Sequence, residues 1–233
     1  MTGALDFTVV QENLTYFLIG RYPHGPVGGL LLTLYLAAVS CVLSFFGGVV
    51  LGLLSLSRNR LIKFFIETLI QILRGMPLLM VIFWAYFLLP ALLGHTVPEN
   101  WTVIIALTVF TSAYMSQIVR AGIEGVPPGQ TEAAISTGLK LWQATLFVVL
   151  PQGLRNMIPS FVNQFVSLIK DTSLAYIVGV SELTQIATQV NNRSLVYPTE
   201  IFLFIAAVYF VICYLFTGLS RRLEERLAWR KPI

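Results

Sequence analysis

Charged residues are scarce in this sequence of 233 residues. Asp, Glu, Lys and Arg make up 11% of it and hydrophobic residues 56%, whereas an average soluble domain is about 25% charged. So few charges cannot cover a soluble globule, which excludes a soluble enzyme, a disordered regulator and a nucleic-acid-binding arm. Together with a mean hydropathy of +0.78, the composition predicts an all-α polytopic membrane protein.

Cysteine and histidine are also rare. Cys41 and Cys213 each lie inside an apolar run, which favours small core residues over a disulfide or a metal pair. His24 and His95 are far apart and lack the spacing of metal ligands, so no metal site is expected. The N-terminus lacks a basic region followed by a short apolar region, and we therefore expect no cleaved signal peptide.

Long runs without charge predict about five transmembrane helices, because a helix needs about 20 mostly apolar residues to cross the hydrocarbon core. The fourth span is the least regular, since Lys170 and Asp171 interrupt it and one of its sides is polar. The five predicted spans cover residues 28–57, 64–89, 100–119, 157–178 and 201–220.

Cations gather after the first span, in the 120–155 segment and after the last span. The positive-inside rule places these segments in the cytoplasm, so that the N-terminus lies outside and the C-terminus inside. The start of the chain is weakly amphipathic, which suits the outer interface. The predicted organisation is an external amphipathic segment over 1–27, a transmembrane domain over 28–220 with a cytoplasmic loop at about 122–150, and a basic cytoplasmic tail over 221–233.

The cytoplasmic loop carries the most specific pattern. A Pro-Pro-Gly turn at 127–129 ends the extension of the third span. A short, Ala-rich helix is predicted over 131–137, and Gly138 permits a left-handed turn after it. A second helical piece follows, which Pro151 is expected to close. Such a short helix fits a cleft in a cytoplasmic partner, where Glu132 is available to pair with an arginine.

This loop resembles the EAA motif of ABC importer permease subunits. The resemblance extends from about residue 28 to residue 219, and the flanking motifs resemble the polar amino acid branch of that family. The residues that match the EAA motif are Glu132, Ala133, Ala134, Gly138, Leu150 and Pro151. The flanking motifs are Ala113-Tyr114, residues 118–122, residues 126–130, residues 170–174 and Arg74-Gly75-Met76-Pro77. Met76, Trp84 and Leu89-Pro90 look most like the glutamate/aspartate subgroup.

The resemblance implies a type I ABC importer permease fold in the bacterial inner membrane, with a cytoplasmic coupling helix formed by the EAA-motif residues. It implies three partners: a cytoplasmic ABC ATPase dimer, a second permease subunit that is identical or homologous, and an external solute-binding protein. The sequence has no G-x-x-x-x-G-K-[ST] loop. We therefore expect no cofactor on this chain, with ATP and magnesium bound by the partner ATPase.

Polar residues recur inside two predicted spans, where lipid contact would be costly. Those of the fourth span share one helical face: Asn156, Ser160, Asn163, Ser167 and Lys170. Those of the third are Thr108, Ser112, Ser116 and Gln117. Such faces line a polar path or hold helices together, and the sequence leaves both readings open. The predicted path consists of Arg74, Gln117, Asn163, Ser167, Lys170, Asp171, Thr172 and Ser173.

A zwitterionic amino acid needs a cationic group for its carboxylate and an acceptor for its ammonium. Arg74 or Lys170 suits the first role and Asp171 the second, although the same charges could instead pair with one another and fix a helix bend. Relatives carry Ala-Glu where this chain has Ser116-Gln117, and the loss of a carboxylate suits an acidic substrate. The predicted substrate is glutamate, aspartate or glutamine, and the alternative is a basic amino acid.

Two other classes of membrane protein compete with this reading. An intramembrane enzyme would need paired aspartates, an H-E-x-x-H motif or a Ser/His dyad, and the sequence has none. No catalytic residue is therefore predicted. A passive channel would not need the cytoplasmic docking loop.

Overall fold

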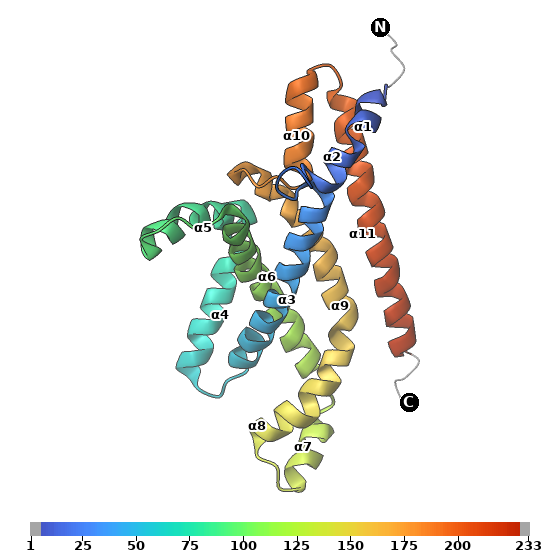
Figure 1. Ribbon diagram of the computed structural model, residues 1–233. Helices are drawn as coiled ribbons and strands as arrows, with labels where there is room; N and C mark the ends of the chain where they lie inside the picture. Colours follow the sequence, from blue (N-terminus) through green and yellow to red (C-terminus); the bar gives the residue numbers. More distant parts are fainter. Residues whose placement is uncertain (1–5, 229–233) are drawn as a thin grey trace. The chain divides into compact units, whose positions relative to one another are not determined.

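The computed structural model describes the backbone of residues 6–228 and the side chains of residues 6–222. Residues 1–5 of the N-terminal segment and residues 229–233 of the basic tail lie outside the described part. The described chain is helical, as predicted, with two isolated β-bridges (Figure 1). The helices are α1 (Thr8–Glu12), α2 (Leu14–Ile19), α3 (Gly29–Ser55), α4 (Arg60–Gly75), α5 (Leu78–Leu93), α6 (Glu99–Glu124), α7 (Pro128–Ser136), α8 (Leu141–Ala144), a π-helix (Thr145–Val149), α9 (Leu150–Asp171), a 3₁₀ helix (Thr172–Val178), α10 (Leu183–Ser194) and α11 (Pro198–Ala228).

Three helices are long and apolar enough to cross a membrane within the described chain: α3, α6 and α11. Helices α4 and α5 add a fourth span if the two count as one interrupted crossing. Helix α9, which overlaps the predicted fourth span, is long enough but too polar to pass the same test. The chain is thus a polytopic helical membrane protein with fewer strongly apolar spans than the five predicted.

The second span is interrupted where the sequence reads Arg-Gly-Met-Pro. Asn59 caps the start of α4, accepting hydrogen bonds from the backbone N–H groups of Leu61 (2.9 Å) and Ile62 (3.4 Å). Helix α4 ends at Gly75, and Met76 is extended because the ring of Pro77 disfavours helical backbone in the residue before it. Pro77 then precedes α5, where its missing N–H costs nothing.

Pro151 does not close a helix, contrary to the prediction. The chain continues from α8 through the π-helix into α9, and Pro151 is the second residue of α9. A proline inside a helix lacks one N–H and crowds the preceding turn. The π-turn widens the helix directly before Pro151, which is one of the few ways a helix accommodates such a residue. The helix that overlaps the predicted fourth span therefore begins at Leu150, before residue 157.

The chain divides into two compact units, each assembled from three segments. The first contains the residues up to Val42, Pro77–Thr108 and Val166–Leu215. The second contains Leu43–Met76, Val109–Phe165 and the residues from Phe216 onward.

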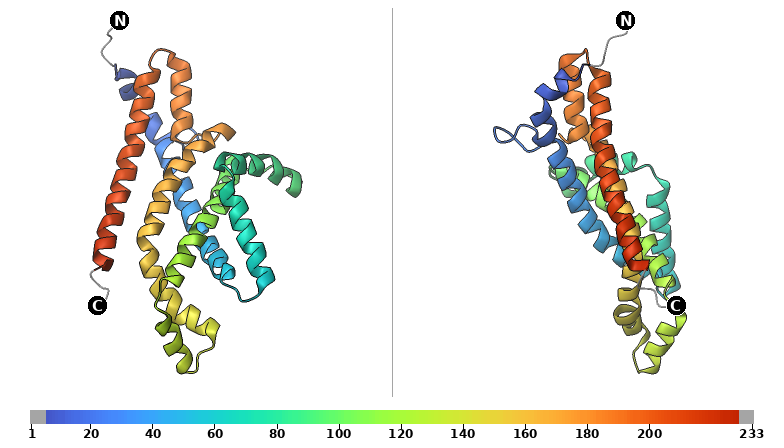
Figure 2. Two further views of the ribbon diagram at one scale, coloured as in Figure 1. Left: turned by 180° about the vertical axis from the view of Figure 1, so that it is seen from behind. Right: turned by 90° about the vertical axis from the view of Figure 1, so that its right-hand side faces the viewer.

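The core of the first unit joins the start of the chain to α10 and α11. Helix α10 lies beside the first part of α11 in every view (Figures 1 and 2). Val9, Val10 and Phe17 from α1 and α2 are buried against residues of these two helices. The ring of Phe17 is fully buried and lies 5.4 Å from that of Phe204. The N-terminal segment is thus packed on protein along one side, and its place at an outer membrane interface remains a prediction.

In the second unit, α3 and α6 approach closely through small residues. A Cβ added to Gly48 would lie 2.3 Å from the Cβ of Met115, and one added to Gly52 would lie 2.8 Å from that of Val119. The hydroxyl of Ser112 points toward the carbonyl of Ser44 at 3.5 Å. Gly48 and Gly52 of α3 and Ser112 of α6 therefore serve helix packing within this chain.

This packing makes Gly48 intolerant of a methyl group. We expect Gly48→Ala to lower the thermal unfolding midpoint of the detergent-purified protein, because the overpacking costs about 1–3 kcal/mol. Gly218→Ala is the matched control, since no heavy atom lies within 4 Å of its added Cβ. It should leave the midpoint unchanged or raise it slightly. Equal midpoints for the two variants would contradict the close approach of α3 and α6.

Candidate functional site

The predicted loop helix is present as α7, which begins at Pro128 and ends at Ser136. Glu132 and Ala133 are exposed, whereas Ala134 is buried. Gly138 has a φ of +91°, as the prediction of a left-handed turn requires. The N–H of Leu139 donates to the carbonyl of Ala134 at 3.3 Å and closes the helix end.

The loop helix is tied to the start of α9. The side-chain amide of Gln152 donates to Oε1 of Gln130 at 3.2 Å and to the carbonyl of Val148 at 2.9 Å. Leu150 is buried and Pro151 exposed, and both lie in the first turn of α9, outside the loop helix. The result is a small helical projection with an exposed acidic face at Glu132.

The polar face predicted for the fourth span lies on α9. Asn156, Ser160, Asn163 and Lys170 are exposed in the single chain, and Ser167 is half-buried. A polar stripe in a membrane helix is costly against lipid. Because its own chain leaves most of this stripe uncovered, we expect water or another subunit to face it.

The polar residues of α6 have a different environment. Ser112 and Ser116 are buried, and the Ser116 hydroxyl donates to the carbonyl of Ala113 at 2.7 Å. Gln117 is half-buried. Of the two readings that the sequence left open, the α6 serines fit helix packing, whereas the α9 face remains available to a path.

Helix α9 ends at Asp171, where a 3₁₀ helix begins. Thr172 is buried and its hydroxyl donates to the carbonyl of Ile169 at 2.7 Å, while Asp171 and Ser173 are half-buried. The 3₁₀ helix ends at Val178 and is followed by Gly179, which has a φ of +86°. Helix ends inside a membrane protein expose backbone groups able to bind polar ligands.

Glu182, which sequence reasoning missed, starts the next helix. Its fully buried carboxylate accepts from the N–H groups of Thr184 and Gln185, both at 2.8 Å, and from the hydroxyl of Tyr209 at 3.2 Å. The N–H of Leu183 donates to the hydroxyl of Thr33 at 3.1 Å. A carboxylate at a helix N-terminus satisfies free N–H groups and complements the helix dipole. The available signal was the sequence Gly-Val-Ser-Glu at residues 179–182, directly before an amphipathic run.

Arg74 is held at the end of α4. The Arg74 guanidinium lies 5.2 Å from the ring centroid of Tyr114, and the Tyr114 hydroxyl donates to the backbone carbonyl of Arg74 at 3.4 Å. Arg74 is exposed. It belongs to the second unit, whereas Lys170 and Asp171 belong to the first. Its proposed contact with substrate remains a prediction.

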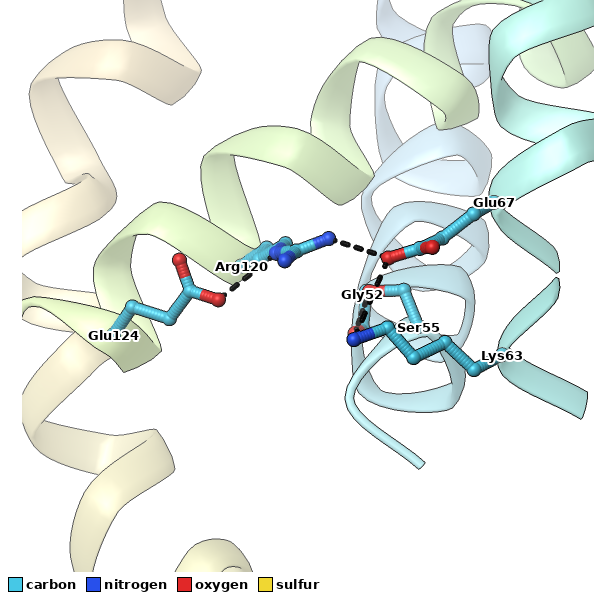
Figure 3. A network of polar contacts seen from close by, with 6 residues as sticks. All are labelled: Gly52, Ser55, Lys63, Glu67, Arg120 and Glu124. Atoms are coloured by element: carbon cyan, nitrogen blue, oxygen red, sulfur yellow. Dashed lines mark hydrogen bonds and ion pairs between the residues drawn. The ribbon is translucent and has the colours of Figure 1, made fainter. Parts of the chain in front are cut away.

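An ion-pair network in the second unit joins α4 to α6 (Figure 3). Arg120 donates from Nη1 to Oε1 of Glu67 at 2.7 Å and from Nε to Oε1 of Glu124 at 2.9 Å. Lys63 lies 3.9 Å from the same Glu67 oxygen. Between this network and Arg74, the two helices share an apolar contact around Ile70. The network fixes the end of α6 that leads into the loop helix.

The exposed loop helix α7 and the uncovered polar face of α9 are two surfaces that this chain leaves open to other molecules. The chain belongs to the family of binding-protein-dependent transport system inner membrane components, which matches residues 44–229. This membership confirms the predicted transport role, in which the chain is not itself an enzyme.

The chain is similar in sequence to several amino acid permeases. The chain is 42% identical over 200 residues to the probable glutamine ABC transporter permease protein GlnP of Bacillus subtilis (strain 168), covering 85% of this chain and 91% of that protein. It is 31% identical to the glutamate/aspartate import permease protein GltK of Escherichia coli O6:H1, covering 96% and 98%. It is 30% identical to the arginine transport system permease protein ArtQ of B. subtilis, covering 96% and 97%. The predicted resemblance to polar amino acid permeases is confirmed.

A solved structure shares the fold. The crystal structure of an amino acid ABC transporter with histidines superposes with a TM-score of 0.82 at 29% identity, covering 96% of this chain and 100% of that one. The predicted importer permease fold is therefore confirmed over nearly the whole length of the chain.

The Glu67–Arg120 pair offers a direct test of the site's geometry. We expect Arg120→Gln to lower the unfolding midpoint, because it leaves the Glu67 carboxylate without its guanidinium. Adding Glu67→Gln should recover most of the loss, with a coupling free energy on the order of 1 kcal/mol for a pair this exposed. Lys63→Gln is the control and should have little effect, since Lys63 is more distant and more exposed. Additive effects of Arg120→Gln and Glu67→Gln would argue against the pairing.

Proposed function

We propose that this chain is the permease subunit of an ATP-driven importer for a polar amino acid, with glutamine, glutamate or aspartate as the substrate class. The uncovered polar face of α9 is the observation that carries this proposal, because it supplies a hydrophilic surface that lipid cannot cover. The names of the glutamine and glutamate/aspartate relatives support the substrate class. The arginine relative keeps a basic amino acid as the alternative.

The path follows an interrupted fourth crossing made of α9, the 3₁₀ helix and α10. Lys170 and Asp171 end its first part, and they provide a cation for the substrate carboxylate and an acceptor for its ammonium. The neutral Gln117 fits an acidic or amide side chain better than a basic one. A second permease subunit, identical or homologous, faces the α9 stripe and completes the path.

The loop helix α7 is the contact for a cytoplasmic ATPase dimer, which binds ATP and magnesium. Glu132 meets a basic pocket of that partner. ATP binding draws the two loop helices together and opens the path outward, where a solute-binding protein delivers the amino acid. The substrate biases this cycle only through a difference in its affinity for the two states. This arrangement places the N-terminus outside and the C-terminus in the cytoplasm.

The test is reconstitution of the chain with its partner subunits in vesicles. Uptake of radiolabelled glutamine, glutamate and arginine is measured with ATP inside and each binding protein outside. Saturable, ATP-dependent uptake of glutamine or glutamate is expected. A preference for arginine would favour the alternative, and no uptake of any amino acid would contradict the function.

The loop helix should be required for coupling. We expect Glu132→Lys to reduce ATPase binding by reversing a charge, and Gly138→Val to distort the end of α7, since a β-branched residue resists a φ of +91°. Gly218→Val is the matched control, because Gly218 lies outside the loop helix, an added Cβ there meets nothing within 4 Å and its φ is not in the left-handed region. Co-purification of the ATPase and substrate-stimulated ATP hydrolysis provide the measurement. Normal values for Glu132→Lys and Gly138→Val would contradict the docking role.

Asp171 should affect substrate affinity. Asp171→Asn keeps the shape but removes the charge, so we expect the half-saturating substrate concentration to rise about ten- to a hundredfold while the complex still assembles. If Asp171 only pairs with Lys170, exchanging the two residues should restore uptake. Wild-type uptake kinetics in Asp171→Asn would remove this residue from the path.

A further inference from the structure

A cavity of about 590 Å³ opens in the second unit beside the loop-helix region. Its walls come from the end of α3, the end of α6 and the α8–π-helix segment. Leu53, Leu56, Ile123 and Leu146 make them apolar. The volume lies within the range of about 300–1,000 Å³ typical of sites for small ligands. None of the roles proposed above uses this cavity.

One cationic and one aromatic side chain, Arg58 and Trp142, lie at the edge of the cavity. Arg58 lines it and is exposed, three residues beyond the end of the apolar helix α3. Among the side chains of residues 6–222, Arg58 makes no ion pair. Trp142 also lines the cavity and is 59% exposed. Tryptophan is enriched where the apolar bilayer meets its headgroups, and arginine binds phosphate with several N–H groups.

We propose that this cavity binds an anionic phospholipid of the inner leaflet, with the phosphate at Arg58 and an acyl chain along the leucine-lined wall. A protein segment would bring backbone N–H and C=O groups that need partners. The walls offer few, because the one hydroxyl in them, on Thr145, already donates to the carbonyl of Leu141 at 3.0 Å. An acyl chain needs none, and a negative headgroup complements the unpaired guanidinium.

The position of the cavity gives such a lipid a consequence for transport. The lipid would bridge the ends of α3 and α6 to α8, the segment through which the loop helix joins α9. An anionic lipid would then brace the loop against the transmembrane helices. The inference rests on the proposed function only for the side of the membrane, because lipid binding itself requires neither transport nor ATP.

The experiment measures quenching of Trp142 fluorescence by brominated lipids in the assembled transporter. The three other tryptophans, Trp84, Trp101 and Trp229, are replaced by phenylalanine, and the complex is placed in nanodiscs. Dibrominated phosphatidylglycerol is compared with dibrominated phosphatidylcholine at equal mole fractions. We expect an apparent preference of about fivefold for phosphatidylglycerol, because one cation near the membrane surface contributes about 1 kcal/mol to the binding of an anionic lipid.

Arg58→Gln should abolish that preference, and Arg60→Gln is the control. Arg60 carries the same charge two residues away but does not line the cavity, so its loss should leave the preference intact. Equal quenching by the two lipids, or equal effects of the two variants, would overturn the proposal. Quenching that appears in the isolated chain but vanishes in the assembled complex would show that a protein subunit covers the cavity, which would also overturn it. Neither result would affect amino acid uptake, so failure here is distinct from failure of the proposed function.

Discussion

The buried carboxylate of Glu182 is the interaction on which the start of α10, after the 3₁₀ helix, depends. Inside a membrane a broken helix leaves N–H groups that water cannot satisfy. Glu182 accepts two of them at the start of α10, and the Tyr209 hydroxyl donates to it from α11. Ser181, the residue before Glu182, accepts a hydrogen bond at its carbonyl from the N–H of Gly29 at the start of α3 (2.9 Å). The capped start of α10 is thereby bonded to both α11 and the start of α3.

Helix α9, which precedes this capped helix start along the chain, is polar along one face. Helix α9 carries Asn163 and Lys170 on an exposed face and ends at Asp171, directly before the 3₁₀ helix. In the second unit, the same helix begins at the loop projection that α7 forms. Along the chain, the loop helix α7 is therefore joined to the polar face of α9 through α8 and the π-helix.

Local chemistry was predictable from the sequence, whereas contacts between distant residues were not. The first span, the loop helix and the left-handed Gly138 follow from apolar runs, alanine content and glycine geometry, and the structure contains all three. Pro151 was misread because a π-turn, which no residue pattern announces, lets the helix continue. The Arg120–Glu67 pair joins residues 53 positions apart, and the burial of Glu182 depends on Tyr209 of another helix. Such pairings arise only once the helices pack.

A cysteine at Asn163 tests most directly whether the α9 face lines a hydrophilic path. In the assembled transporter, Asn163→Cys on a background without Cys41 and Cys213 is treated with a charged, lipid-insoluble thiol reagent. We expect labelling that slows when substrate and binding protein are added. Labelling by lipid-soluble reagents alone, at a rate that substrate does not change, would show that this face meets lipid and does not line a path.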